Sequence, residues 1–265
     1  RSKSDDPSWW TARHRNHSLT AIFGYLGGEK HHGFRNAFLT AAPNFTQPTN
    51  NTIANIPMHI GSLTDRSIAQ GKERATYELY QDSIFCPILP GDGPPQKRFF
   101  DVIMSGCLPV VFAFNRSDLR KQDTTGKHYH SWWDGFDGSI PKDVSLQTSY
   151  PFCKGLFPKE PSVGIDYQSF VVEIHATKDN GCDFGCGHNR SKTCQFDCLI
   201  PTLEKLLQPE SRDKLLEMRR NLQQAAVMFS YGLEDNSYKS FDAFAVLLTQ
   251  VGHYLQQLPK HKTEL

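Results

Sequence analysis

The sequence predicts an α/β fold in which a parallel sheet is flanked by helices. Residues 83–112 hold two short apolar runs that enclose a Pro/Gly-rich loop and an amphipathic segment, a pattern typical of strand, loop, helix and strand. Residues 19–42 repeat the strand, loop and helix. Apolar stripes at helical spacing within 211–229 and 240–258 predict two further helices that pack against the sheet.

The first predicted unit begins with an apolar strand at 19–25. A glycine-rich loop follows, from Gly27 and Gly28 to Gly33, and residues 34–42 form a helix with Arg35 in its first turn. A helix amino terminus has free N–H groups and a partial positive charge, which suits a phosphate. The alternative is a tight turn that only packs on the sheet.

The next segments lead to the central unit. Residues 42–56 are polar, contain proline and are expected to form an exposed loop. Residues 57–63 are expected to form a short strand, and residues 71–82 a helix.

The central unit, residues 83–112, carries two charged side chains in the first turn of its helix. Arg98 and Asp101 are three residues apart, and the loop before them contains Gly91. A guanidinium can fork onto a diphosphate, and a carboxylate can accept two ribose hydroxyls, so the pair fits a nucleoside diphosphate. The alternative is a surface ion pair at helical spacing.

Composition narrows the partners and the compartment. The chain has 265 residues and a formal net charge of +1, so no large field favours nucleic acid or a membrane surface. It also holds more glycosylation sequons than chance predicts, which favours the lumen of the secretory pathway, with the Golgi preferred over the endoplasmic reticulum. We expect a signal or membrane anchor outside this chain. The sequons are at Asn16, Asn44, Asn50, Asn115 and Asn189.

Seven cysteines are present, and four of them are clustered. Zinc would explain four thiolates, but an oxidising lumen favours two disulfides. The symmetric spacing suggests nested pairing, Cys182 with Cys198 and Cys186 with Cys194. Cys86 and Cys107 either pair across the sheet or remain separate buried thiols, and Cys153 is left over.

The carboxyl-terminal part contributes one more strand and several helices. Residues 171–174 are an apolar run that predicts a strand of the sheet. Residues 202–207 predict a helix that precedes the two longer amphipathic ones.

Several separated blocks resemble the signature of the exostosin family of glycosyltransferases. The resemblance implies a Rossmann-like lobe, the donor-binding half of a GT-B fold. The whole of 1–265 would be this single domain, with a lead-in at 1–18, an inserted loop at 115–149, a Cys-rich excursion at 182–198 and carboxyl-terminal helices at 202–258. The matching residues are Phe85-Cys86, Pro90-Gly91, Arg98, Asp101, 106–111, Pro151-Phe152, 165–167 and Phe170.

The resemblance also implies an activity: inverting transfer of a sugar from a nucleotide diphosphate donor, expected to be a UDP-sugar, to a glycan acceptor. Arg98 and Arg35 would bind the diphosphate and Asp101 the ribose. Gly27, Gly28 and Gly91 would form the donor loops. Trp132 and Trp133, in the inserted loop, would either stack on the acceptor or simply bury the loop.

The resemblance leaves the catalytic base unidentified. No required metal is predicted, because arginines and helix amino termini can balance the diphosphate charge. The alternative function is a non-catalytic nucleotide-sugar- or glycan-binding domain, either a degenerate transferase or an isolated donor lobe.

Overall fold

The structure is a computed structural model. It describes residues 15, 17–23, 33–45, 52–53, 56–62, 72–89, 97–113, 165–175, 181–184, 194–229, 248 and 252. The strands are β1 (His17–Phe23), β2 (Thr52–Ile53), β3 (Ile56–Ser62), β4 (Ser83–Pro87), β5 (Leu108–Ala113), β6 (Val172–His175), β7 (Cys182–Asp183) and β8 (Gln195–Phe196). The helices are α3 (Gly33–Ala41), η2 (Ala42–Phe45), α4 (Lys72–Gln81), α5 (Lys97–Ser105), η4 (Tyr167–Ser169), α8 (Leu199–Leu207), η6 (Pro209–Ser211) and α9 (Arg212–Val227).

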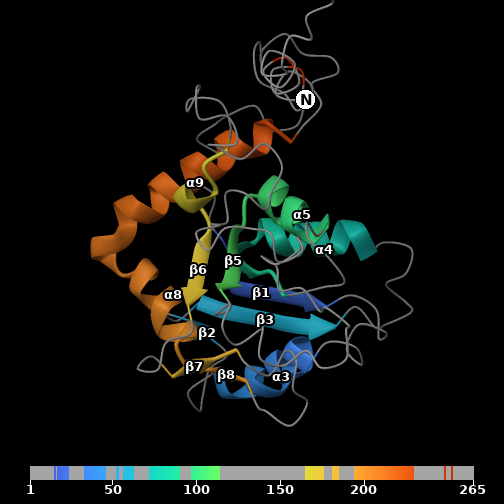
Figure 1. The fold of residues 1–265 in the computed structure, drawn as a ribbon, viewed down its shortest axis with the longest axis vertical. Coiled ribbons are helices and arrows are strands. Elements are labelled where there is room, and N and C mark those ends of the chain that lie inside the picture. The colour runs from blue at the N-terminus through green and yellow to red at the C-terminus, as the bar shows by residue number, and fades with distance from the viewer. Residues whose placement is uncertain are drawn as a thin grey trace, which may run out of the picture.

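A six-stranded sheet with the order β2-β3-β1-β4-β5-β6 forms the centre of the molecule (Figure 1). The pairs β1–β3, β1–β4, β4–β5 and β5–β6 are parallel, and only β2 runs antiparallel, against β3. Each parallel step needs a crossover, and α3, α4 and α5 provide those from β1 to β5; most of the connection from β5 to β6 lies outside the described residues. The predicted Rossmann-like α/β fold is therefore confirmed.

Helices cover both faces of the sheet. In Figure 1, α3 lies below the sheet beside β7 and β8, whereas α4 and α5 lie above it. On the α3 side, the rings of Phe38, Phe112 and Phe196 pack edge to face, with centroids of Phe38 at 5.9 Å from Phe112 and 5.2 Å from Phe196. On the other side, the Phe99 ring of α5 lies 5.8 Å from the Tyr167 ring of η4. The apolar residues of the sheet are thus buried from both directions.

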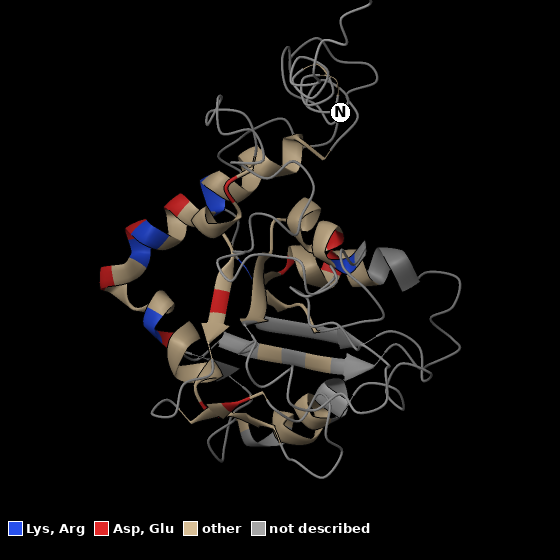
Figure 2. Cartoon of the chain, in the orientation of Figure 1, with Lys and Arg blue, Asp and Glu red and all other residues tan. Residues whose placement is uncertain are grey.

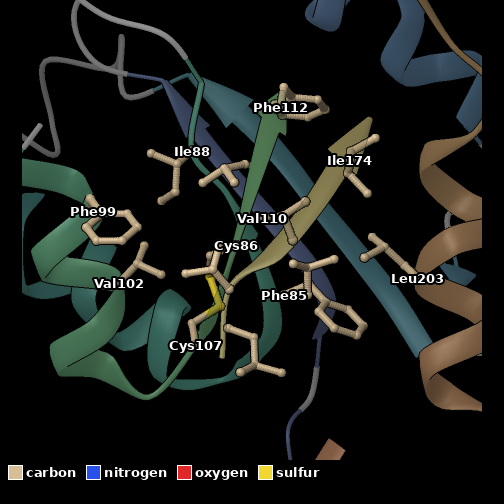
Figure 3. Packing of buried hydrophobic residues seen from close by; sticks show 14 of the residues in the cluster. Phe85, Cys86, Ile88, Phe99, Val102, Cys107, Val110, Phe112, Ile174 and Leu203 are labelled. Atoms are coloured by element: carbon tan, nitrogen blue, oxygen red, sulfur yellow. A yellow bond between two sulfur atoms is a disulfide. The ribbon is translucent and has the colours of Figure 1, made fainter. Parts of the chain in front are cut away.

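The unit made by β4, α5 and β5 is the best-buried part of the described chain. All five residues of β4 are buried, as expected for a parallel strand covered on both faces. Cys86 and Cys107 form a disulfide with Cα atoms 5.9 Å apart, next to Phe99 and Val102 of α5 (Figure 3). The sequence left this pairing open, and the structure resolves it as a crosslink within the core.

A buried arginine joins the ends of two helices. Arg15 is 3% exposed; its guanidinium donates to the carbonyl oxygen of Gln81 and, at 3.0 Å, to that of Gly106. These carbonyls lie at the carboxyl-terminal ends of α4 and α5, where the helix dipole is negative. The cation therefore stabilises both helix ends at the amino edge of the sheet.

Outside the central unit, the structure corrects one expectation and confirms another. Residues 42–56 are not only an exposed loop: Phe45 is buried 5.1 Å from the Phe38 ring, and β2 extends the sheet. The predicted pairing of Cys182 with Cys198 is confirmed, and Cys194 is also disulfide-bonded, so the zinc alternative is wrong. Cys186 and Cys153 lie outside the described residues.

Candidate functional site

The strand order has its topological switch point between β1 and β4. The chain leaves β1 for α3 on one face and leaves the neighbouring β4 for α5 on the other face. Open parallel sheets bind ligands at such a point, outside the carboxyl ends of the strands. The predicted donor-loop residues follow these two strands, Gly27 and Gly28 after β1 and Gly91 after β4, but all three lie outside the described residues.

Arg98 lies in the first turn of α5, which begins at Lys97. Its side chain is half-buried, and its Nη1 atom is buried and makes no hydrogen bond to any residue that the structure describes. A guanidinium nitrogen withdrawn from water and left without an acceptor is unfavourable, and buried polar groups normally have partners. An anion at the amino terminus of α5 would supply the missing acceptor.

Asp101 is half-buried one turn after Arg98, and both side chains interact electrostatically with Tyr80 of α4. The Tyr77 hydroxyl of α4 donates to the Met104 carbonyl oxygen at 2.9 Å, so α4 lies along this side of α5. Arg98, Asp101 and Met104 are three residues apart and so lie along one side of α5.

Tyr80 is a residue of this neighbourhood that the sequence did not reveal. Its side chain is 2% exposed, and burial raises the pKa of its phenol to about 12, while Arg98 lowers that pKa and Asp101 raises it. The phenol makes no hydrogen bond to another described residue. The only sequence signal is its position three residues after Tyr77, which equally describes a core aromatic.

Arg35 lies in the first turn of α3, which follows β1 on the opposite face of the sheet. The structure thus brings the first turns carrying Arg35 and Arg98 to the same edge; the Arg35 side chain is not described. Trp132 and Trp133 lie outside the described residues, as do Asn16, Asn50, Asn115 and Asn189; Asn44 falls in η2, with its side chain undescribed.

Comparison with known families fits this arrangement. Residues 24–131 match the family model of the exostosin GT47 domain. This part of the chain is therefore similar to the exostosin GT47 domain. The matched range begins directly after β1 and includes α3 and α5, the helices that follow β1 and β4.

Three similar proteins come from Arabidopsis thaliana. A xyloglucan-specific galacturonosyltransferase is 46% identical over 41 residues, which is 16% of this chain and 6% of that protein. Two probable xyloglucan galactosyltransferases, GT13 and GT20, are 50% identical over 36 residues and 49% identical over 35 residues, covering 14% and 13% of this chain. The matches span only 6–8% of the length of these relatives.

Within the part of the chain that the structure describes, no group of three or more His, Cys, Asp and Glu side chains could hold a metal ion. None of the helices described is both long and apolar enough to cross a membrane.

Proposed function

We propose that this chain is the donor-binding lobe of a glycosyltransferase and binds a nucleoside diphosphate sugar at the carboxyl edge of the sheet, between β1 and β4. The observation that carries the proposal concerns Arg98, in the first turn of α5. Its buried Nη1 atom makes no hydrogen bond to a described residue. The GT47 match over 24–131 supports the same chemistry, because this range includes that turn.

Each residue has a role in this proposal. Arg98 forks onto the diphosphate and stabilises the negative charge that grows as the sugar leaves. The first turn of α3 and its Arg35 approach the diphosphate from the other face, and Asp101 accepts the ribose hydroxyls. Because Arg98, Arg35 and two helix amino termini supply positive charge, the proposed site does not require a metal.

The names of the relatives suggest the first sugar and the first acceptor to test. A UDP-activated galactose or galacturonic acid is the first donor to test, and a xyloglucan oligosaccharide is the first acceptor. We propose inversion at the anomeric carbon and a location in the Golgi lumen, where the acceptor would be a glycan or a glycoprotein. The base that deprotonates the acceptor is not among the residues assigned here.

The test is nucleotide binding by the full chain and by two matched variants. UDP at about 100 times its Kd should stabilise the fold by about 2.7 kcal/mol in thermal unfolding. Arg98→Gln should weaken UDP binding by at least tenfold, the cost of one charged hydrogen bond of about 1.5 kcal/mol. Arg212→Gln, an exposed arginine of α9, serves as the control and should bind like the wild type.

Unchanged UDP affinity in Arg98→Gln would contradict the site, and no binding of any nucleotide sugar would contradict the function. Sugar transfer is then assayed with the full-length protein that contains this chain. UDP binding without any transfer there would favour the non-catalytic alternative.

A further inference from the structure

A groove lies between the edge strand β6 and the two helices α8 and α9. Its volume is about 530 Å³, within the range of roughly 300–1,000 Å³ that is usual for ligand pockets. One wall is formed by η4 and residues 171–173, and the other by α8, η6 and α9. Because β6 pairs only with β5, part of its backbone faces this groove without a strand partner.

The charged lining of the groove is balanced. Lys205 and Lys214 line it together with Glu173 and Glu217, and Figure 2 shows acidic and basic residues interspersed along α8 and α9. A site for an anion would carry an excess of donors, and a site for a cation an excess of carboxylates. A ligand hydroxyl needs both kinds of partner, because it donates and accepts.

The uncharged polar side chains of the groove also favour a ligand with hydroxyl groups. The Ser169 hydroxyl donates to the Asp166 carbonyl oxygen at 2.6 Å, and the Thr202 hydroxyl donates to the Cys198 carbonyl oxygen at 2.7 Å. Because each hydroxyl hydrogen is used in these bonds, the Ser169 and Thr202 hydroxyl oxygens can only accept hydrogen bonds from a ligand in the groove. The Gln168 amide also lines the groove and offers both donors and an acceptor.

Apolar side chains complete the surface. Val171, Val172, Leu206 and Met218 line the groove between the polar groups. A sugar ring presents apolar C–H groups as well as hydroxyls, so this mixture of surfaces matches both parts of the ring. Lys205, Lys214 and Glu217 are exposed to solvent at the groove, where they can contact hydroxyls that a purely apolar ligand lacks.

One side of the groove reaches a residue near the carboxyl edge of the sheet. Glu173 lines it and lies 2.9 Å, Oε2 to Nε2, from His175, the last residue of β6. Glu173 is two residues, or about 7 Å of strand, from the carboxyl edge of the sheet. His175 is paired in register with Ala113 of β5 at that edge.

We propose that this groove binds a neutral oligosaccharide and is the acceptor subsite of the transferase. The proposal rests on the proposed function for its catalytic meaning, but the groove and the donor site share no residue. An oligosaccharide lying along β6 would place one end near the carboxyl edge, where the donor sugar is expected. Acceptor binding and donor binding should then be separable by substitution.

The experiment measures oligosaccharide binding by the full chain. An array of length-matched neutral and uronic-acid-containing oligosaccharides is probed with the wild type, and hydrogen exchange is followed with the best-bound sugar. We expect neutral members to bind and to slow exchange in 168–173, 202–206 and 211–221. Leu206→Trp, which fills the groove, should abolish this binding, and Lys214→Gln should weaken it about tenfold.

Arg220→Gln is the matched control, because Arg220 is exposed on α9 but does not line the groove. All three variants should bind UDP like the wild type. The inference is overturned if no array member binds, if only acidic sugars bind, or if Leu206→Trp binds sugar normally. Binding of an extended peptide in preference to sugars would also overturn it, since the free edge of β6 would then be the attraction. Arg98-dependent UDP binding would survive any of these results, so failure of the groove and failure of the donor site are distinguishable.

Discussion

Tyr77 and Tyr80 lie on the same helix and differ in what their hydroxyls contact. The Tyr77 hydroxyl donates to the Met104 carbonyl oxygen at 2.9 Å, whereas the Tyr80 hydroxyl makes no hydrogen bond to a described residue and interacts electrostatically with Arg98 and Asp101. We predict that Tyr80 donates to the bound nucleotide. Tyr80→Phe should therefore weaken UDP binding about tenfold, the cost of one hydrogen bond to a charged group, as measured by titration calorimetry.

Tyr77→Phe is the control for this prediction. It removes a hydroxyl from the same helix pair and should cost about 1 kcal/mol of unfolding free energy with UDP affinity unchanged. If both variants bind UDP like the wild type, Tyr80 is a core residue and nothing more.

Tyr80 also predicts a pH dependence of stability. Its pKa is raised to about 12 from 10.0, mainly by burial, so the folded state keeps the proton at pH values where the unfolded state has lost it. The stabilisation is complete below pH 10 and is lost as the pH rises toward 12. At pH 11 the loss should be about 1.4 kcal/mol, and the Tyr80→Phe variant should lack this part of the decline between pH 9 and 11 in urea unfolding. Parallel declines in both proteins would show that the phenol is not responsible.

At the scale of elements, the Cys86–Cys107 disulfide encloses the loop and helix that carry Arg98. The two cysteines are separated by 21 residues and fully buried. Replacing both by alanine should lower the unfolding free energy by about 3 kcal/mol, mostly by freeing the unfolded chain, as measured by denaturant unfolding. Because α5 would also be less constrained, UDP binding should weaken.

The Cys182–Cys198 disulfide gives the comparison. It spans 16 residues beside β7 and β8 and does not enclose α5 or Arg98. Its double alanine variant should lose a similar amount of stability but retain wild-type UDP affinity at a temperature where it is folded. Equal effects of both variants on UDP binding would mean that the core disulfide only stabilises the fold.

The elements that the sequence predicted well are those with a strong local pattern. The bounds of α4, α5, β4 and β6 agree with the expected segments to within a few residues, because their apolar periodicity is set by one buried face. The prediction of an exposed loop at 42–56 is incomplete, because Phe45 is buried against Phe196, about 150 residues away in the chain. No local pattern reports such a partner.

The same limit applies to the candidate site. Arg98 and Asp101 were identified by spacing and resemblance, but Tyr80 depends on how α4 packs against α5, and the groove depends on how α8 and α9 turn beside β6. The strand order was likewise not readable, since the sequence shows which strands are parallel but not which ones are neighbours.

At the scale of the whole molecule, α3 and α5 cover opposite faces of the sheet, yet both begin at its carboxyl edge. The first N–H groups of a helix have no intrahelical partner, so a diphosphate at this edge can accept hydrogen bonds from both helices. UDP should therefore slow hydrogen exchange at 33–36 and 97–100 together, while 202–221 remains unchanged. This pattern would distinguish a nucleotide held across the switch point of the sheet from one bound on a single face, which would protect only one of the two turns. Mass spectrometry of peptides from both turns checks the prediction, with Arg98→Gln as the sample in which both protections should decrease.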